Sequence, residues 1–487
     1  MFSCTSNDDA DVVKHTGCLC HRPEIQVLTR RVNTGLSRRG FVAGMTTSIA
    51  SLGLSRHATA LAVPAPPSRP ILFANFRLFD GKSSSLREGV RLLVEGNRIK
   101  AISTGNPAAP DGAQVIDCGG RVLMPGLIDA HWHSMFASLP LSNLLTGDIG
   151  FIHLAAGAEA ERTLMRGFTT VRDLGGPVFA FKQAIDQDLV SGPRIYPSGA
   201  MITSTGGHGD LRPLSDVPRS PAGPPSALEK SGASNIADSP DEVRLRVREQ
   251  LFQGASQIKL VGGGGVSSPR SPLDMSTLSE AELRAGVEAT EDRNTYVAVH
   301  AYAPATIQRA IAAGVKCIEH AHLMDEATAK LMADKGIWLS IQPFLTDDDT
   351  GVLAGPSRIA QLQVFGGTDN AYNLAKKYEI RTAFGSDMLF SEKLAARQGT
   401  MLTHLTKWYS NAEILTMATA TNAELLGLSG PRNPYPGKLG VVQENALADL
   451  LLLDGNPIEN IRLIEDPAKN LLIIMKDGRI YKNALQP

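Results

Sequence analysis

The sequence has few of the features that mark disulfide-bonded, nucleic-acid-binding or membrane-spanning proteins. Only 5 of its 487 residues are cysteine, which is too few for a disulfide framework in a chain of this length. The formal net charge is −1 and no dense run of lysine and arginine occurs, so we expect neither nucleic acid nor an anionic membrane surface as a partner. Beyond the N-terminal region no segment has the length and apolarity of a membrane span. The chain, 43% hydrophobic, is long enough for one α/β barrel and a smaller domain.

The first 68 residues are expected to precede the folded domain. Ser37-Arg-Arg-Gly-Phe-Val42 is followed by a small-residue apolar run, by His57-Ala-Thr-Ala-Leu-Ala62 and by a proline-rich segment. This order is typical of an export signal, and the paired arginines resemble a bacterial twin-arginine signal. We predict an export leader and linker over residues 1–68 and a periplasmic or secreted bacterial protein. The alternative is an unrelated basic and apolar leader, and Cys18-Leu-Cys20-His21 within it is a weak metal-binding pattern.

Strand patterns occur at both ends of the remaining chain. Near the start they cover 71–79, 90–94 and 99–102, with a turn at Gly96-Asn97, and near the end they cover 448–453, 471–475 and 479–481. We predict one small β-sandwich domain built from residues 69–124 and 433–487. Two independent β appendages are the alternative.

Strand and helix patterns alternate over residues 125–432. Eight short apolar segments have the length of buried strands. The strands are expected at 127–130, 169–174, 194–198, 257–261, 296–300, 316–320, 337–341 and 382–387. Amphipathic helices are expected between most of them, at 159–166, 240–253, 280–292, 304–313 and 325–335. This alternation predicts an α/β fold, a (β/α)8 TIM barrel.

Candidate metal ligands follow the ends of several predicted strands. His131 and His133 are two residues apart at the end of the first strand, where both imidazoles point to one side. Four further polar residues end later strands: Lys259, His300, His320 and Asp387. Any one of them could be an ordinary buried polar residue. Barrel enzymes act at the carboxyl ends of their strands, so the joint placement predicts an active site.

The chain resembles the amidohydrolase superfamily, in the branch of imidazolonepropionase-like enzymes, Xaa-Pro dipeptidases and ochratoxinase. The resemblance spans residues 71–482. It rests on Pro125-Gly-Leu-Ile-Asp-Ala-His-Trp-His133, Gly167-Phe-Thr-Thr-Val-Arg-Asp173, Gly192-Pro-Arg-Ile-Tyr196, Ser204-Thr-Gly-Gly-His-Gly-Asp210, Ile258-Lys-Leu260, Val299-His-Ala-Tyr302, Ile318-Glu-His-Ala321, Gly385-Ser-Asp387 and Ala448-Asp-Leu-Leu-Leu-Leu453. These motifs identify the family far more narrowly than the substrate.

The resemblance implies two divalent metal ions in the barrel mouth. His131, His133 and Asp387 would hold the more buried ion, His300 and His320 the second, and an N-carboxylated Lys259 would bridge them. Zinc is expected, and manganese, cobalt and iron are alternatives. A hydroxide shared by the two ions would attack an amide carbonyl, and Asp387 would move the proton to the leaving nitrogen.

Two further residues are candidates for substrate binding. His208 lies in a glycine-rich turn after the third strand, and Tyr302 follows His300 by two positions. The resemblance implies that they contact the substrate carboxylate or the scissile carbonyl, and the alternative is a structural role. His322 and Arg172-Asp173 are expected to orient the ligands through hydrogen bonds.

Two loops are expected near the site. Gly262-Gly-Gly-Gly265 lacks the lysine and hydroxyl residue of a phosphate-binding loop and is interpreted as a strand-end loop that lets the backbone approach the metals. Residues 211–235, rich in Pro, Ser and Gly, form either a lid or a disordered insertion. Substrate choice is expected to lie there and in residues 344–358.

Three functions are considered. The first is a metal-dependent amidase acting on a dipeptide, an N-acyl amino acid or an ochratoxin-type amide. The second is a hydrolase of cyclic amides, ureas or carbamates, and the third is a non-catalytic scaffold on the same fold. A mononuclear deaminase is disfavoured because such relatives lack the lysine that Lys259 supplies. The expected partner is a small-molecule amide, and relatives often form symmetric oligomers.

Overall fold

The computed structural model describes residues 69–105, 108–220, 223–268 and 270–485. The predicted leader and its Cys18-Leu-Cys20-His21 pattern lie outside these residues. Among the described residues, none of the helices combines the length and apolarity needed to cross a membrane.

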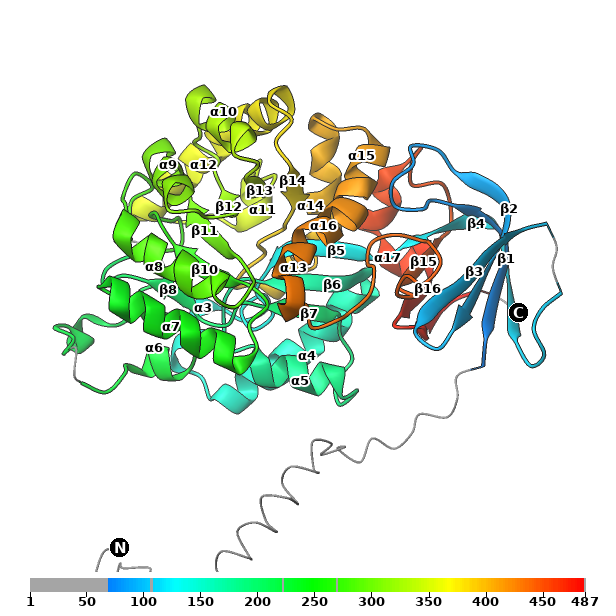
Figure 1. Cartoon of the computed structure of the whole chain (residues 1–487), viewed down its shortest axis with the longest axis horizontal. Helices are drawn as coiled ribbons and strands as arrows, with labels where there is room; N and C mark the ends of the chain where they lie inside the picture. Colours follow the sequence, from blue (N-terminus) through cyan, green and yellow to red (C-terminus); the bar gives the residue numbers. More distant parts are fainter. Residues whose placement is uncertain (1–68, 106–107, 221–222, 269, 486–487) are drawn as a thin grey trace, which may run out of the picture. The chain divides into compact units, whose positions relative to one another are not determined.

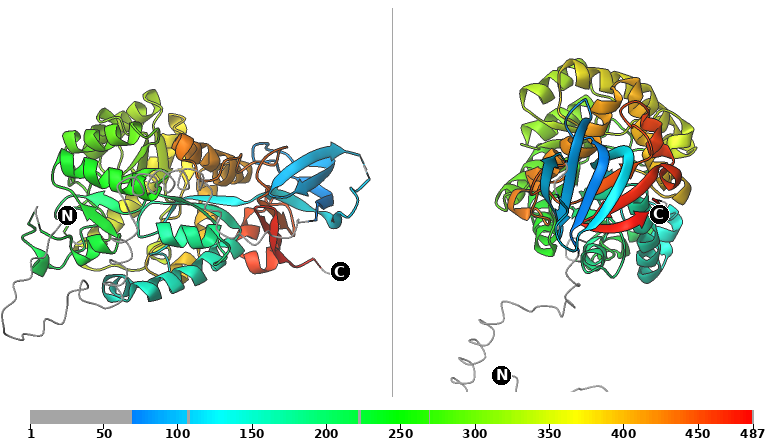
Figure 2. Two further views of the ribbon diagram at one scale, coloured as in Figure 1. Left: turned by 60° about the horizontal axis from the view of Figure 1, so that its bottom comes forward. Right: turned by 90° about the vertical axis from the view of Figure 1, so that its right-hand side faces the viewer.

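The strands of both chain ends pair in one seven-stranded sheet of order β17-β16-β15-β4-β1-β2-β3. In Figures 1 and 2 the blue N-terminal strands and the red C-terminal strands lie side by side in it. Its strands are β1 (Ile71–Leu78), β2 (Arg87–Glu95), β3 (Arg98–Thr104), β4 (Gln114–Pro125), β15 (Leu450–Leu453), β16 (Leu471–Lys476) and β17 (Arg479–Asn483). All predicted strands of these ends are found. The pairing does not show the predicted two-sheet sandwich.

A parallel strand arrangement occupies the middle of the chain. One sheet has the order β5-β6-β7 and another the order β14-β13-β12-β11-β10-β8-β9. The strands are β5 (Leu127–Trp132), β6 (Phe168–Asp173), β7 (Arg194–Pro197), β8 (Met201–Thr203), β9 (Ser234–Ile236), β10 (Ile258–Val261), β11 (Val297–Ala301), β12 (Cys317–His320), β13 (Trp338–Ile341) and β14 (Thr382–Phe384). Asp387 N, just beyond β14, donates to His131 O of β5 at 2.8 Å. This arrangement is consistent with the predicted (β/α)8 barrel.

Two predicted strands differ from the observed ones. The third is split into β7, which pairs with β6, and β8, which pairs with β10, because Gly199 between them has φ +73°. The eighth ends at Phe384 rather than at Asp387. Asp387 has φ +49°, which is incompatible with continuing a strand.

Helices follow most of the parallel strands along the chain, and several of them pack against these strands. The longer ones are α4 (Ile149–Met165), α5 (Phe179–Asp186), α7 (Pro240–Gln253), α8 (Glu280–Glu291), α9 (Pro304–Ala312), α10 (Glu326–Asp334) and α12 (Gly355–Lys377). Helix α7 shows why these segments are helical: Ser239 accepts a hydrogen bond from Glu242 N, Pro240 occupies the first turn, and Gly254 ends the helix at φ +106°. The prediction of 240–253 is confirmed at both ends.

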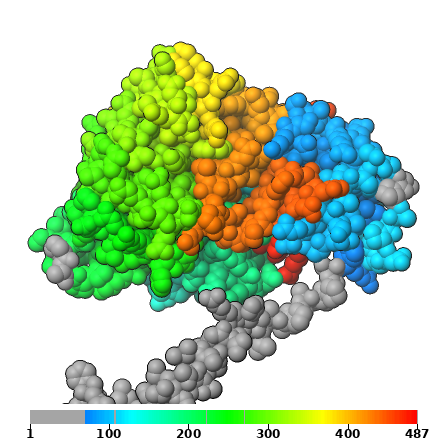
Figure 3. All heavy atoms as spheres, viewed as in Figure 1, coloured from blue at the N-terminus to red at the C-terminus, as the bar shows by residue number. Residues whose placement is uncertain are grey.

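The other helices of the described residues are short. They are α3 (Leu141–Thr146), η2 (Leu214–Asp216), α6 (Ala227–Lys230), α11 (Asp347–Thr350), α13 (Glu392–Ala395), α14 (Gln398–His404), η3 (Leu405–Lys407), α15 (Asn411–Thr416), η4 (Met417–Thr421), α16 (Asn422–Leu426), η5 (Gly427–Arg432), η6 (Ile461–Glu465) and α17 (Pro467–Asn470). The orange segment that contains α15 and α16 lies between the green helices and the blue strands in Figure 3. Within it, the Asn422 amide donates to Ile128 O at 2.7 Å and Phe384 O at 2.8 Å, which ties β5 to β14.

Candidate metal-binding active site

The six predicted ligands border one cavity at the carboxyl ends of the parallel strands. His131 ends β5 with His133 just after it, Lys259 lies in β10, His300 in β11 and His320 at the end of β12, and Asp387 follows β14. All six line a cavity of about 180 Å³. The four histidines and Lys259 are each at most 4% exposed. A buried cluster of this composition needs partners to offset its lost hydration.

Three of the predicted ligand histidines lie close to the Asp387 carboxylate. Asp387 Oδ1 lies 3.4 Å from His131 Nε2 and 3.3 Å from His133 Nε2. His131 Nε2 and Asp387 Oδ1 are buried and have no hydrogen-bond partner. The atoms that His131, His320 and Asp387 offer all lie within 4.8 Å of one another, whereas the resemblance groups His131 and Asp387 with His133.

One ring nitrogen of each histidine is anchored on an acceptor. The contacts are His131 Nδ1 to Glu319 Oε2 (2.8 Å), His133 Nδ1 to Gly175 O (3.2 Å), His300 Nε2 to Gly264 O (2.8 Å) and His320 Nδ1 to Gln342 Oε1 (2.7 Å). A neutral imidazole that donates its single N–H in this way leaves a lone pair on the other nitrogen, which is the arrangement that metal-binding histidines use.

Burial keeps these side chains in the protonation states that suit metal binding. It lowers the pKa values of His131, His300 and His320 well below the ordinary range, with the Lys259 charge acting in the same direction. Burial also lowers the pKa of Lys259 to about 8, although the Glu319 and Asp387 charges oppose this shift. The imidazoles of His131, His300 and His320 are therefore neutral at pH 7, and the neutral amine of Lys259 is accessible near that pH.

A buried ion pair that the sequence did not predict positions His131. Arg172 and Glu319 are both fully buried, and Arg172 Nη2 donates to Glu319 Oε1 at 2.6 Å. Glu319 Oε2 accepts the His131 hydrogen bond. The same arginine donates to Ala130 O and to the Tyr296 hydroxyl. Arg172 therefore orients the predicted ligand His131 through Glu319 rather than directly. Glu319 lies in a motif of the family resemblance, but the sequence alone assigned it no function.

Asp129 is a second residue whose role was missed. Its Oδ1 accepts from His131 N and Ser386 N, each at 3.0 Å, and its Oδ2 from the Ser386 hydroxyl and the Gln398 amide. Burial raises the pKa of Asp129 to about 6 despite these hydrogen bonds. Asp129 therefore fixes the backbone on either side of the site.

The backbone is strained at two predicted ligands. His320 has φ +79° and Asp387 has φ +49°, a region that non-glycine residues rarely adopt. Such conformations persist where surrounding contacts enforce them, and they concentrate at functional sites.

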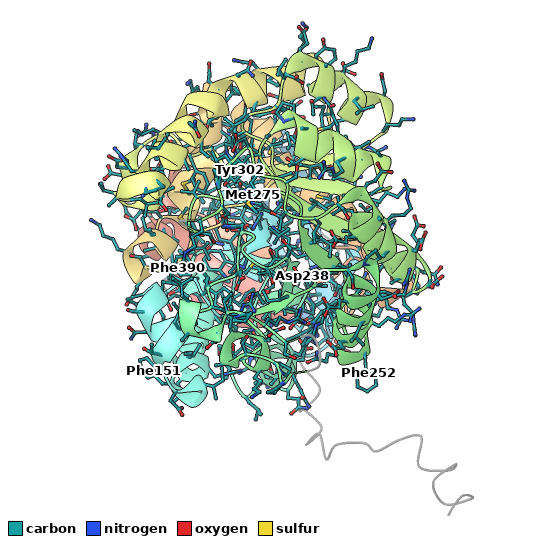
Figure 4. The ribbon with its side chains drawn as sticks, turned by 90° about the vertical axis from the view of Figure 1, so that its left-hand side faces the viewer. Phe151, Asp238, Phe252, Met275, Tyr302 and Phe390 are labelled. Carbon is teal, nitrogen blue, oxygen red and sulfur yellow. The ribbon has the colours of Figure 1, made fainter. Side chains whose placement is uncertain are left out.

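His208 and Tyr302 pack directly against the histidine cluster. The His208 ring stacks on His300 with centroids 4.3 Å apart, and Tyr302 stacks on His320 at 4.9 Å. Gly265 makes room for His208, because a Cβ there would lie 2.3 Å from His208 Nδ1. Burial lowers the pKa of His208 to about 3 and raises that of Tyr302. Tyr302 lies near the middle of the view in Figure 4. Substrate binding by this pair stays a prediction.

The other expected neighbours of the site are arranged as follows. His322 Nε2 donates to Gln342 O at 2.9 Å and Asp173 accepts from Ser134 N at 2.7 Å. Neither lines the cavity. In the Gly262–Gly265 loop, Gly262 N and Gly263 N both bond to His300 O, so the backbone does approach a predicted ligand closely.

The walls of the cavity come from the connections between strands. Leu211, Leu228, Ala233 and Ser234 contribute from the predicted lid segment. Other wall residues come from α3 and from residues 344–365 and 388–394. Those segments surround the predicted ligands with mainly apolar side chains.

Comparison with known proteins agrees with the site. Residues 122–481 match the Amidohydrolase family. Ochratoxinase from Aspergillus niger is 32% identical over 387 residues, covering 74% of this chain and 76% of ochratoxinase.

Two solved structures are similar over most of both chains. A prolidase in complex with N-methylphosphonate-L-proline is 33% identical with a TM-score of 0.78, covering 85% of this chain and 100% of the prolidase. The A. niger ochratoxinase crystal structure is 26% identical with a TM-score of 0.74, covering 85% and 96%. The predicted superfamily and branch are confirmed: this chain belongs to the Amidohydrolase family and is a hydrolase acting on carbon–nitrogen bonds.

Proposed function

We propose that this protein is a binuclear metal-dependent amidohydrolase that cleaves an amide bond in a dipeptide, an N-acyl amino acid or an ochratoxin-type amide. One observation carries the proposal: six candidate metal-binding side chains from the ends of five strands line one cavity. The prolidase and ochratoxinase relatives support an amide substrate. A closed (β/α)8 barrel over residues 125–432 is part of the proposal.

The donor set fits two divalent cations. His131 Nε2 and Asp387 Oδ1 are buried without hydrogen-bond partners, and a cation would satisfy both. His131, His133 and Asp387 would hold one ion, and His300 and His320 the other. Imidazole and carboxylate ligands together favour zinc.

Lys259 is proposed to bridge the ions as an N-carboxylated side chain. A protonated amine would repel cations, whereas a carbamate is an anionic ligand with two oxygens. Forming the carbamate requires a neutral amine, and burial brings the pKa of Lys259 to about 8. Among the described residues no carboxylate lies within ion-pair distance of Lys259 Nζ, so its ammonium form gains no direct partner.

The protein's own residues supply orientation and proton transfer. When bound, the two ions would lower the pKa of a shared water to give a hydroxide nucleophile and would polarise the substrate carbonyl. Asp387 takes the proton released on attack and passes it to the leaving nitrogen. His208 and Tyr302 bind the substrate carboxylate or the scissile carbonyl. Glu319 and Gln342 hold the ligand imidazoles in orientation.

The organisation of the chain outside the site is also part of the proposal. Residues 69–124 and 433–487 form a composite β domain, and residues 1–68 form an export leader and linker. The mature protein is periplasmic or secreted, and it assembles as a homo-oligomer. Mass spectrometry of the mature N-terminus and light scattering test the leader and the oligomeric state.

A substrate screen on metal-reconstituted protein tests the function. We expect hydrolysis of dipeptides or N-acyl amino acids and none of cyclic ureas. Turnover of cyclic amides, ureas or carbamates alone would favour the second function. Purification without stoichiometric metal would favour a scaffold, and 13C NMR of the folded protein reconstituted with 13C-bicarbonate tests the carbamate.

A further inference from the structure

Helix α3 and the start of α4 expose large apolar side chains beside the cavity. The exposed residues are Leu145 (45%), Ile149 (46%), Phe151 (50%) and Leu154 (77%). Across residues 139–158, Asp148 is the single aspartate, glutamate, lysine or arginine, and its Oδ1 caps α4 by accepting from Gly150 N at 2.8 Å. The outer surface of this segment is therefore apolar and nearly uncharged.

A second segment of the same kind precedes and begins α12. Its exposed residues are Val352 (72%), Ile359 (64%) and Leu362 (51%). Across residues 351–368, Arg358 is the single charged residue, and its Nη2 donates to Asp347 Oδ2 at 3.0 Å. We call the seven exposed residues of the two segments the apolar rim.

The two segments of the apolar rim border one cavity and are connected by α13. Leu145 of the first segment and Leu353 of the second both line the cavity. Helix α11, just before the second segment, contacts α13. On the other side of α13, Arg162 of α4 pairs with Glu392 of α13 at 3.5 Å. The rim therefore belongs to one region of the surface, next to the cavity.

The exposed apolar residues of α7 lie in a different setting. Phe252 is 93% and Leu245 53% exposed, but the helix also carries Asp241, Glu242, Arg244, Arg246, Arg248 and Glu249. Isolated apolar side chains among charges are common on protein surfaces. In Figure 4, Phe252 lies on the opposite side of the view from Phe151, which belongs to the rim.

The apolar rim has the size and the charge of a contact between two copies of this chain. Residues of this size present about 200 Å² each when fully exposed, so the rim offers roughly 800 Å², as much as each partner contributes to a typical stable interface. A two-fold interface places the same patch on both sides, and a nearly uncharged patch can face itself without like-charge repulsion. A lipid surface fits less well, because the two segments contain no tryptophan or tyrosine and Arg358 as their one lysine or arginine.

Helix α3 has little support from its own chain. None of its six residues is fully buried, and its N-cap, Pro140, makes no side-chain hydrogen bond. Its leucines nevertheless line the cavity: Leu141, Leu144 and Leu145. A helix of this length is not stable without tertiary contacts. A contact on its outer side would therefore help to fix this part of the cavity wall.

We propose that a second copy of this chain docks on the apolar rim about a two-fold axis, and that the docked copy holds α3 against the cavity. This part of the cavity wall is then complete only in the assembled protein. The inference assigns a surface to the homo-oligomer proposed above, and it does not depend on the reaction that the cavity supports.

Sedimentation velocity of the full chain over a range of concentrations tests this inference, and we expect self-association. Leu154→Asp and Ile359→Asp each bring a carboxylate into the contact, where it loses hydration without gaining a partner. Each variant should therefore raise the dissociation constant at least about 100-fold. Phe252→Asp, which adds the same charge on α7, is the matched control and should leave the constant unchanged. Circular dichroism should show that all three variants fold, because the replaced side chains are exposed in the single chain.

Hydrogen exchange identifies the contact surface independently. In the associated wild type, the backbone amides of residues 141–154 and 352–362 should exchange at least about tenfold more slowly than in Leu154→Asp and Ile359→Asp. The amides of α7 should exchange equally in all of them. Protection confined to the two segments is a result that a contact through another surface would not give.

The outcomes separate this inference from the proposals on which the rest of the function depends. Self-association that persists in both rim variants, or α3 amides that exchange equally fast in the wild type and the variants, would overturn the inference and leave a homo-oligomer through another surface standing. A wild-type chain that stays monomeric would overturn both. Binding of that monomer to uncharged phosphatidylcholine vesicles, lost in Leu154→Asp, would then identify a lipid surface as the occupant of the rim. None of these outcomes contradicts amide hydrolysis.

Discussion

The polar floor of the cavity, which consists of the six predicted ligands with His208 and Tyr302, is built differently from its mainly apolar walls. Floor residues lie in or directly after parallel strands, and their polar atoms are fixed by buried partners such as Glu319 and Gln342. Wall residues lie mainly in the connections between strands, which include the long helix α12 and short helices such as α3, where none of the residues is fully buried. The floor can therefore hold one chemistry with high precision, while exposed wall positions such as those of α3 can change in sequence at little cost to the fold.

Among the floor substitutions, Asp387→Asn should cause the largest loss of activity. The amide has nearly the same shape but cannot take the proton from the attacking water, so kcat should fall by about 10³-fold. Most bound metal should remain, since the histidines are unchanged. Steady-state kinetics together with metal analysis check this, and retention of activity would contradict the assigned role.

Glu319→Gln should show whether the floor depends on the buried residues that orient its histidines. The neutral amide no longer balances the fully buried Arg172 charge, and unfolding should become easier by about 3 kcal/mol. Because an uncharged amide oxygen also accepts the His131 N–H less strongly than a carboxylate does, metal affinity should fall by about 10- to 100-fold.

Thermal unfolding and competitive metal titration measure the two effects. Glu288→Gln, at an exposed position of α8 whose side chain is 59% exposed, provides the control. Wild-type metal affinity in Glu319→Gln would show that His131 is oriented without the carboxylate.

The floor could be predicted because strand periodicity determines where its residues point. His131, His300 and His320 were found from their places at strand ends, and the structure brings them to one cavity. The supports were missed because each depends on a partner that is distant in the sequence: Glu319 and His131 are 188 positions apart. A signal was present, since a glutamate inside the buried strand Cys317–His320 requires a partner.

The walls could not be predicted in the same way. A leucine such as Leu144 or a phenylalanine such as Phe365 has the same pattern in a sequence whether it fills the core or faces a cavity. The segments 211–235 and 344–358 were expected to influence substrate choice, and both contribute residues to the wall. Helix α3 was not predicted, because it has only six residues and its N-cap, Pro140, makes no side-chain hydrogen bond.

His208→Ala and Tyr302→Phe test whether these two floor residues bind the substrate or only pack against the histidines. If these residues bind the substrate, KM should rise by about tenfold in each variant, which corresponds to one lost hydrogen bond. Metal content should be unchanged. Kinetics with wild-type KM and kcat in both variants would support a purely structural role for the pair.

Asp210→Asn should have the smallest effect on catalysis, because Asp210 does not line the cavity. The Asp210 carboxylate accepts from Arg212 Nε and Nη2, each at 2.7 Å, and from Gly206 N at 2.8 Å. Burial raises the pKa of Asp210, but these hydrogen bonds outweigh burial and the pKa lies below its ordinary value. The resulting stabilisation is present above about pH 4 and is lost as the pH falls through the lowered pKa.

Replacing this carboxylate leaves the buried Arg212 guanidinium without its charged partner, so it should cost about 3 kcal/mol of stability at pH 7 and nothing at strongly acidic pH. Since the same turn carries His208, KM should rise by about two- to threefold, which matches a small loss of positioning. Unfolding curves at several pH values and steady-state kinetics measure both, with Asp241→Asn, whose side chain is 94% exposed, as the control. An unchanged KM would mean that Gly265 and the stacking on His300 are enough to hold His208 in place. The Asp210–Arg212 pair would then have no part in positioning His208.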